Sequence, residues 1–444
     1  MNCAQLNLYS LSWGGLRHMQ LKLSEEKVFK DPVHNYVHVK DPVIWQLINT
    51  PEFQRLRRIR QLGTSYLTFH GAEHSRFSHS LGVYEITRRI ISQFERSGYT
   101  DWPTEEKLVA LCAALLHDVG HGPFSHSIEE AFDMNHEEWT CKIIMGDTEI
   151  GAILRKVAPD FPEKVASVIE KTYDKPIVVN LVSSPLDADR MDYLLRDAYY
   201  TGVNYGTIDL DRILRMLRPY QGRVVVKDSG MHAVEDYLMS RYQMYWQVYF
   251  HPVTRSSEII LRQIFRRAKE LVQGGYSFEF MLPSLLSLIK GNITVQEYLR
   301  IDESIIQTAF NQWTEEKDEL LRDLCTRFLD RKLYKYVEVD RMSSDEIKEI
   351  TQAFREVGLN PDYDLEIDFP SDLPYDVFRP DDEDSQQQII IIDKQERLRD
   401  ISEVSEIVRS ISGIQRGKYH LYFPQEKVKA VLGQLPPQIG KIFL

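Results

Sequence analysis

Apolar residues that recur at steps of three and four constrain the fold more than any other feature of this sequence. Between Leu108 and Leu116 five apolar residues follow this spacing, which predicts a helix with one buried face. Thr104 is the expected N-cap of that helix, and a Gly-Pro turn beginning at Gly120 is expected to end it. Similar periodic runs cover residues 81–94, 186–199, 234–249 and 258–272. The first two-thirds of the chain is therefore expected to be mainly α-helical.

The last hundred residues have a different character. Short strands are expected earlier in the chain, at 37–39 and 223–226, where β-branched residues cluster. After about Asp340, an acidic run followed by glutamines indicates an exposed linker near 380–388. A strand–helix–strand–helix pattern then covers residues 389–392, 402–411, 418–423 and 426–435. We therefore expect an N-terminal extension (1–24), a helical core (25–340) and a small C-terminal α/β lobe (341–444).

Charge and cysteine content narrow the possible partners. Lys plus Arg number 54 and Asp plus Glu 66, so the formal net charge is −12. Such a chain is a poor candidate for wrapping nucleic acid, although a local groove could still serve. No stretch approaches the length of a membrane-spanning helix, and residues 1–24 lack a secretory signal pattern. The four cysteines form no Cys-x-x-Cys pair, and we expect a cytoplasmic protein without a membrane or nucleic-acid partner.

The segment from His117 to His126 holds three histidines and an aspartate where the expected helix meets its Gly-Pro turn. Because His117 and His121 are four residues apart, we expect them to share one helical face. Nearby, Glu129 and His136 offer a carboxylate–imidazole pair. A His-Asp dipeptide alone means little in a chain with 13 histidines, and a capped helix end is the simpler interpretation of it.

Two other segments carry the same kinds of side chain. His79 stands near the start of an expected helix, with Arg76 one turn earlier. Asp189, Tyr193 and Asp197 follow steps of four in another helix and should project from one face. A purely structural helix would rarely line one face with two acids. The remaining histidines show no partner pattern, and most are interpreted as structural or surface residues: His18, His34, His38, His70, His74, His232, His251 and His420.

Two imidazole nitrogens and two carboxylate oxygens would form a mixed shell for a divalent ion of intermediate hardness, such as iron, manganese, zinc or nickel. Magnesium prefers oxygen ligands and would more naturally sit on a phosphate nearby. A metal ion in such a shell lowers the pKa of water and neutralises charge on a phosphoryl oxygen. The three segments together therefore predict metal-assisted hydrolysis.

These segments resemble the HD-domain hydrolase superfamily, and within it the deoxynucleoside triphosphate (dNTP) triphosphohydrolases. That family includes bacterial dGTPase-like enzymes and the eukaryotic enzyme that joins a sterile-alpha-motif to an HD domain. The resemblance is dense from about Lys27 to Glu270 and is carried by residues 27–34, 50–57, 61–63, 76–82 and 117–126. It implies a mainly α fold with an HD-domain helical core. It also implies the metal ligands His79, His117, Asp118 and Asp189.

The resemblance assigns roles to further residues. The catalytic set would be His121, His126, Glu129 and His136, and which of them is the general acid stays open. Arginines suit a triphosphate because their planar fork bonds phosphate oxygens in pairs. An aromatic ring under the sugar would leave no room for a 2′-hydroxyl. The implied substrate contacts are Arg76, Arg190, Tyr193 and Arg241 at the triphosphate, Gln61 and Asp197 at the 3′-hydroxyl, Tyr249 under the sugar, and Leu62.

The resemblance also implies a homotetramer with a nucleotide effector pocket where its subunits meet. The matching residues of this pocket are Lys27, Val28, Asn49, Gln54 and Arg57. Asn49 stands where the family has an aspartate that reads the guanine edge, which puts activation by guanine nucleotides alone in doubt. Three other positions depart from the eukaryotic relative: Arg190 replaces Lys, Glu129 replaces Asp, and Tyr245 replaces His.

The implied activity is conversion of a dNTP and water into deoxynucleoside and triphosphate, activated by nucleotide and serving control of the dNTP pool. Two alternatives stay open, besides nucleic-acid binding or nuclease action in a local groove, which the net charge of −12 disfavours. One is another HD activity, on nucleoside monophosphates or cyclic phosphodiesters. A longer polyphosphate is favoured instead by three arginines, Arg76, Arg190 and Arg241. The other is a nucleotide-sensing scaffold without turnover, which would not need the acid–base set.

Overall fold

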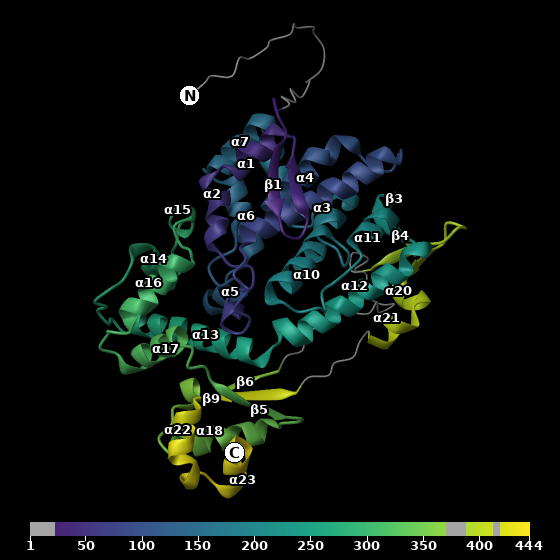
Figure 1. Ribbon diagram of the computed structural model, residues 1–444. Helices are drawn as coiled ribbons and strands as arrows, with labels where there is room; N and C mark the ends of the chain where they lie inside the picture. Colours follow the sequence, from purple (N-terminus) through teal and green to yellow (C-terminus); the bar gives the residue numbers. More distant parts are fainter. Residues whose placement is uncertain (1–22, 370–387, 412–417) are drawn as a thin grey trace.

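The fold is mainly α-helical, as the apolar periodicity predicted (Figure 1). The computed structural model describes residues 23–369, 388–411 and 418–444. Most of the predicted N-terminal extension and of the acidic linker lies outside these residues. No helix in the described ranges is long and apolar enough to cross a membrane.

The largest hydrophobic cluster is built mainly by the helices before residue 250, and segments near the C-terminus add Ile391, Ile401 and Val408 to it. Its centre is the pair α3 and α4, which pack side by side, with α10 lying against α3. The helices of this part are α1 (Pro42–Ile48), α2 (Pro51–Arg55), α3 (Arg76–Arg96), α4 (Lys107–Leu116), α5 (His126–Phe132), α6 (His136–Met145), α7 (Glu149–Val157), α8 (Phe161–Ile169), α9 (Pro176–Val182), α10 (Ala188–Thr201), α11 (Leu210–Met216) and α12 (Met231–Met244).

A second cluster forms where α13 packs against α5 and α17. A π-helical turn over Tyr245–Tyr249 joins α12 to α13. Phe124 and Ile128, at and just after the His-rich segment, belong to this second cluster, so that segment lies where the two clusters meet. The helices here are α13 (Pro252–Gln273), α14 (Pro283–Ile289), α15 (Val295–Tyr298), α16 (Glu303–Trp313) and α17 (Glu319–Leu329).

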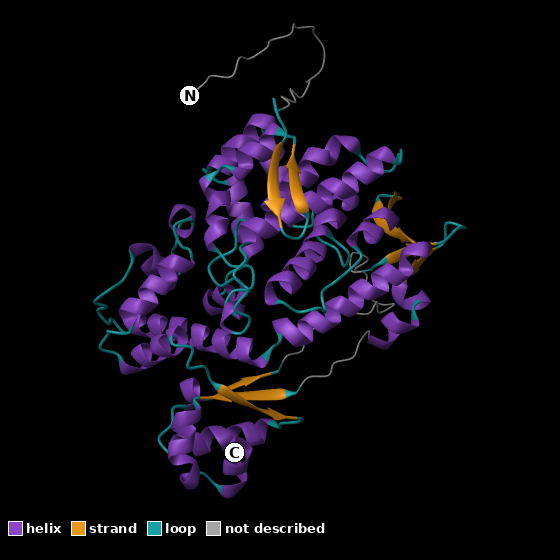
Figure 2. Ribbon diagram, viewed as in Figure 1, coloured by secondary structure: helices purple, strands orange, loops and turns teal. Residues whose placement is uncertain are grey.

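Strands form three small sheets (Figure 2). An antiparallel hairpin pairs β1 (Lys27–Asp31) with β2 (Asn35–Val39). A four-stranded sheet has the order β3-β4-β7-β8, and a three-stranded sheet has the order β5-β9-β6. Their strands are β3 (Leu217–Tyr220), β4 (Arg223–Lys227), β5 (Lys335–Val339), β6 (Glu366–Asp368), β7 (Ile390–Ile392), β8 (Leu398–Asp400) and β9 (Tyr419–Phe423).

The C-terminal α/β elements exist as predicted, but they are divided between two places. Strand β7 pairs in parallel with β4 of the core, and α20 (Ile401–Val404) and α21 (Glu406–Ile411) follow it. The three-stranded sheet makes a separate small lobe around a third cluster, with α18 (Ser344–Glu356), α19 (Pro361–Asp364), α22 (Gln425–Val431) and α23 (Pro437–Gly440). The pairing of β7 with β4 has no local sequence signal, because its partner lies more than 150 residues away.

Two helix boundaries differ from the predictions. The single helix expected over 402–411 is broken at Ser405, whose backbone is extended and whose Oγ accepts the amide of Val408 (3.1 Å) to start α21. Thr104 is not the N-cap of α4. It begins a 3₁₀ turn over Thr104–Glu106, whose last carboxylate is held by Lys175 Nζ at 2.6 Å, and α4 starts only at Lys107.

Candidate active site

His79 lies one turn into α3 and is fully buried. Its Nδ1 is 2.8 Å from Asp192 Oδ2, and its Nε2 is 3.0 Å from Asp189 Oδ1. Gly82, one turn further along α3, makes room for this contact, because a Cβ there would lie 1.8 Å from Asp192 Oδ1. Burial lowers the pKa of His79, but the nearby carboxylates of Asp189 and Asp192 outweigh it and raise the pKa to about 10.

His117 follows directly after α4, which ends at Leu116. The prediction that His117 and His121 share a helical face is therefore wrong, since a turn and not a helix separates them. His117 Nδ1 bonds the carbonyl of Ala114 at 2.9 Å, and its Nε2 lies 3.3 Å from Asp118 Oδ1 and 3.6 Å from Asp189 Oδ1. The loop places both the imidazole and the neighbouring carboxylate at one wall of the site.

Asp189 reaches this wall from the first turn of α10, which Asp187 caps by accepting the amide of Arg190 at 2.7 Å. Burial raises the pKa of Asp189, but the contacts with His117 and His79 lower it by more, so the pKa lies well below its ordinary range. Two histidines and one aspartate thus bring ligand atoms within 4.8 Å of one another, and Asp118 lies beside them.

The donor set fits a divalent ion of the intermediate class. Nε2 of His79 and Nε2 of His117 are both buried without a hydrogen-bond partner in the described structure. Buried nitrogen atoms of this kind are normally satisfied. Their Nδ1 atoms are already engaged, so each imidazole presents its Nε2 towards the carboxylates of Asp118 and Asp189, as metal-binding histidines do. The four residues predicted as metal ligands therefore come together.

Asp118 also holds Arg76, whose Nη1 donates to Asp118 Oδ2. Both side chains are buried. Burial raises the pKa of Asp118, but the charges of Arg76 and His117 lower it well below its ordinary value. Arg76 Nε additionally donates to Ser125 Oγ at 3.0 Å, so the guanidinium is fixed in place at the wall of the site.

Glu129 organises a second group of side chains beside the first. Its Oε1 lies 2.9 Å from His121 Nδ1 and its Oε2 3.0 Å from His136 Nδ1, and the two imidazoles stack with centroids 3.8 Å apart. His121 Nε2 in turn lies 3.4 Å from Asp118 Oδ1. One carboxylate therefore holds two stacked imidazoles beside the proposed metal ligands.

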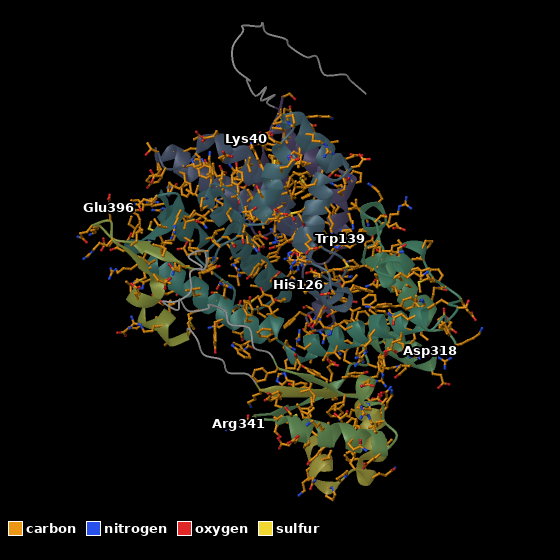
Figure 3. The ribbon with its side chains drawn as sticks, turned by 180° about the vertical axis from the view of Figure 1, so that it is seen from behind. Lys40, His126, Trp139, Asp318, Arg341 and Glu396 are labelled. Carbon is orange, nitrogen blue, oxygen red and sulfur yellow. The ribbon has the colours of Figure 1, made fainter. Side chains whose placement is uncertain are left out.

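Burial, together with the charges of Arg76 and His136, lowers the pKa of His121 to about 3, which keeps this ring neutral at neutral pH. Gly120 allows the close approach of α6, since a Cβ there would lie 2.3 Å from the carbonyl oxygen of His136. His126 differs from the other two histidines: its side chain is 75% exposed and its Nδ1 is 3.6 Å from Glu129. It lies near the middle of the molecule, at the junction of the helical parts (Figure 3).

A cavity of about 460 Å³ opens on both groups. Burial lowers the pKa of Arg190, but the charge of Asp187 raises it more, so this guanidinium stays charged. Arg241 is buried behind the wall, and its Nε has no hydrogen-bond partner in the described structure. The cavity is lined by twelve of the predicted site residues: Gln61, Leu62, Arg76, Asp118, His121, His126, His136, Asp189, Arg190, Tyr193, Asp197 and Tyr249.

The predicted sugar contacts meet within this cavity. Tyr249 donates its hydroxyl to Asp197 Oδ2 at 2.9 Å, and the Tyr249 and Tyr193 rings meet edge to face at 6.1 Å. The other oxygen of Asp197 is 2.7 Å from His74 Nε2. Gln61 Oε1 is buried there without a hydrogen-bond partner in the described ranges. An unpaired acceptor next to a fixed carboxylate suits a ligand hydroxyl.

The predicted effector residues lie apart from this cavity, on the hairpin and on the first two helices. Lys27 and Val28 belong to β1, and Val28 is 48% exposed. Asn49 follows α1 and donates to the carbonyl of Trp45. Arg57 donates to Gln54 Oε1 at 2.8 Å, which fixes its orientation.

Sequence reasoning missed several residues of this site. His34 and His74 were interpreted as structural or surface histidines, yet each bonds a site aspartate, Asp192 and Asp197 respectively. Asp192 itself was not singled out, although it lies one turn beyond Asp189. The cavity wall also contains Arg255 and Glu258 of α13, for which no motif gave a signal.

Comparison with known proteins agrees with this geometry. Residues 76–197 match the HD domain model, and residues 208–436 match the HD-associated region. The uncharacterized protein YwfO of Bacillus subtilis is 55% identical over 92% of this chain and 94% of its own length. The deoxynucleoside triphosphate triphosphohydrolase SAMHD1 of Gallus gallus is 27% identical over 70% of this chain and 56% of its own length.

Among solved structures, a phosphohydrolase from Bacteroides thetaiotaomicron superimposes with a TM-score of 0.78 at 29% identity, covering 90% of this chain and all of that one. The ranges matched by the two family models include every predicted metal ligand and catalytic residue. This chain belongs to the HD-domain family, and it carries an HD domain followed by an HD-associated region.

Proposed function

We propose that this protein is a metal-dependent dNTP triphosphohydrolase, which converts a dNTP and water into deoxynucleoside and triphosphate. One observation carries the proposal: a single cavity is bordered by a buried His/Asp ligand set, by fixed arginines and by the Tyr249–Asp197 pair. These three parts match a scissile phosphate, a polyphosphate chain and a sugar. The similarity to SAMHD1 from several organisms points to the same substrate class.

His79, His117, Asp118 and Asp189 would hold the ion, and we propose iron, manganese, zinc or nickel for this site, with magnesium on the triphosphate. The ion would supply water of lowered pKa and neutralise charge on a phosphoryl oxygen. The two carboxylates among these four residues bring two formal negative charges, which a divalent ion would balance.

The chain's own side chains would perform the remaining work. Water attacks the α-phosphorus in line with the 5′-oxygen, the P–O5′ bond breaks, and the triphosphate leaves intact. Arg76 and Arg190 stabilise its charge from positions that their hydrogen bonds already fix, and Arg241 adds its charge from behind the wall. Such electrostatic stabilisation is the largest contribution in many sites of this kind. An imidazole of the Glu129 group supplies the proton that the 5′-oxygen requires.

Sugar recognition would rest on Tyr249, whose ring is fixed by its bond to Asp197. A ring held at this place excludes a 2′-hydroxyl by steric contact, while Gln61 and Asp197 receive the 3′-hydroxyl. We further propose nucleotide activation at Lys27, Val28, Asn49, Gln54 and Arg57, in a homotetramer, with control of the dNTP pool as the role. Light scattering of the purified protein with and without dNTPs tests the tetramer.

The decisive experiment is product analysis. The purified protein, loaded with Mn²⁺, is incubated with each dNTP alone and in pairs, and with the ribonucleotides as a comparison, and the products are separated by anion exchange. Release of triphosphate and deoxynucleoside supports the proposal. Release of pyrophosphate or orthophosphate, or no turnover with any pair, would refute it. Asp118→Ala should abolish turnover, while Asp236→Ala, outside the site on α12, should not.

A further inference from the structure

The turn of the β1–β2 hairpin carries His34, which contacts Asp192, the residue that also bonds the proposed metal ligand His79. Asp31 at the end of β1 is buried, and its carboxylate accepts the amides of Val33 and His34, each at 2.9 Å, which shapes the turn. This geometry directs the His34 side chain into the core, where it is 1% exposed. The hairpin lies against α3, the helix that carries His79 (Figure 1).

His34 and His79 bond the same carboxylate from opposite sides. His34 Nε2 is 2.5 Å from Asp192 Oδ1, and His79 Nδ1 is 2.8 Å from Asp192 Oδ2. Arg196 donates to both oxygens, at 2.8 Å and 3.0 Å, and to Asp31 at 2.9 Å. All of these side chains are buried, so Asp192 has four fixed donors and Arg196 ties it to the hairpin.

This arrangement controls which nitrogen of His79 is free. A carboxylate only accepts, so the Nδ1 of His79 carries a proton, and Nε2, which faces Asp189, is the nitrogen left for a metal ion. The orientation of the His79 ring then depends on where the Asp192 carboxylate is held. Asp192 sits between α3, which leaves room for it at Gly82, and the hairpin, which supplies His34.

We propose that His34 is a positioning residue for the metal site, and that the β1–β2 hairpin fixes the orientation of the metal ligand His79 through Asp192. The inference rests on the proposed metal-dependent function and deepens it. It gives a role to His34, which lies more than forty residues in sequence from the nearest proposed metal ligand. Removing the group that a metal-binding histidine itself bonds, here Asp192, typically changes metal affinity about 10- to 100-fold; His34 acts through Asp192, so its loss is expected at the lower end of that range.

The same hairpin extends to the surface at its other end. Lys27 and Val28, the proposed effector residues, begin the strand that ends at Asp31. Four steps of an extended strand span roughly 13 Å. A nucleotide bound at Lys27 would therefore contact the same strand whose far end, at Asp31, bonds Arg196 and shapes the turn that carries His34.

The test measures Co²⁺ affinity by visible absorption in the full chain, after the bound metal has been removed with a chelator. His34→Leu removes the donor to Asp192, and His34→Asn keeps a polar side chain that is too short to reach it. His34→Gln restores a donor near the position of Nε2. His38→Leu is the matched control, because His38 lies on the same hairpin but its side chain, 37% exposed, hydrogen-bonds Glu26 at the surface and not Asp192.

We expect the Leu and Asn variants at His34 to bind Co²⁺ about tenfold or more weakly, and the Gln variant and His38→Leu to stay within about twofold of the wild type. Raising Mn²⁺ should restore the kcat of His34→Asn. If the wild type binds no Co²⁺, the proposed function itself fails. If the wild type binds Co²⁺ and His34→Asn binds it equally well, the inference about His34 is overturned, even where His34→Leu fails to fold.

Discussion

Glu129→Gln is the sharpest test of how the site handles protons. The carboxylate of Glu129 makes two contacts within hydrogen-bond distance, to His121 Nδ1 at 2.9 Å and to His136 Nδ1 at 3.0 Å. Burial raises the pKa of Glu129, but its bonds to the histidines hold it well below the ordinary range, so the carboxylate is charged at neutral pH. The glutamine amide can accept from one imidazole, but it presents its NH₂ group to the other.

The expected loss of kcat follows from the one imidazole contact that the glutamine amide cannot accept. One charge-assisted hydrogen bond is worth about 1.5–3 kcal/mol, which corresponds to roughly a 10- to 160-fold lower kcat. The KM and the bound metal should change little, because Glu129 is not among the four proposed metal ligands. Steady-state release of triphosphate from dGTP measures the rate, and elemental analysis measures the metal.

The neighbouring residue supplies the control. Glu130 has the same side chain, is 58% exposed and pairs with Arg262 at the surface, so Glu130→Gln should keep the wild-type kcat. A Glu129→Gln enzyme with a kcat within about threefold of the wild type, well below the loss of one charge-assisted bond, would show that Glu129 does not hold the imidazoles for catalysis. Equal losses in both variants would point to the fold and not to the site.

Four further predictions concern the metal, the sugar, the core and the effect of pH. Chelation should abolish activity and lower the Tm, and Mn²⁺ at a hundred times its Kd should restore about 2.7 kcal/mol of stability. Tyr249→Ala should raise the ratio of GTP to dGTP turnover, because it opens the space for a 2′-hydroxyl. Phe310→Ala should cost about 3–5 kcal/mol in urea unfolding, since this buried ring packs on Phe124. Burial lowers the pKa of His251, which accepts the amide of Val253 at the start of α13. The free energy of unfolding should therefore be highest above about pH 6.5 and should fall as the pH drops below that value. Thermal melts should show a smaller fall for His251→Asn.

The helical architecture could be predicted because each long helix carries its own apolar period. The runs at 81–94 and 258–272 lie within observed helices, and the run at 186–199 begins two residues before α10. The ends of these helices were less predictable. His117 and His121 have helical spacing, yet α4 stops at Leu116, and Phe124 then takes a positive φ of 60° that no local pattern announces.

The sequence pointed to the proposed metal ligands and to the Glu129 group because these residues lie within short motifs. His34 and Asp192 could not be predicted, because the contact between them joins positions 158 residues apart. Spacing reveals which side chains share one element, and it carries no information on which elements meet. For the same reason β7 was assigned to the C-terminal lobe, whereas its hydrogen-bonding partner β4 lies in the core.

The acidic composition and the proposed polyphosphate substrate are compatible because the relevant charges are local. The net charge of −12 is spread over the whole chain, while Arg76 and Arg190 stand at one cavity wall, each beside a buried aspartate. Opposite charges interact more strongly there than at the surface, because the surroundings are less polarisable. A triphosphate entering the cavity would meet guanidinium groups that are already oriented, so little reorganisation is needed when its charge arrives. Raising the ionic strength should therefore weaken dNTP binding only slightly, in contrast to the steep salt dependence that a surface site for nucleic acid would show.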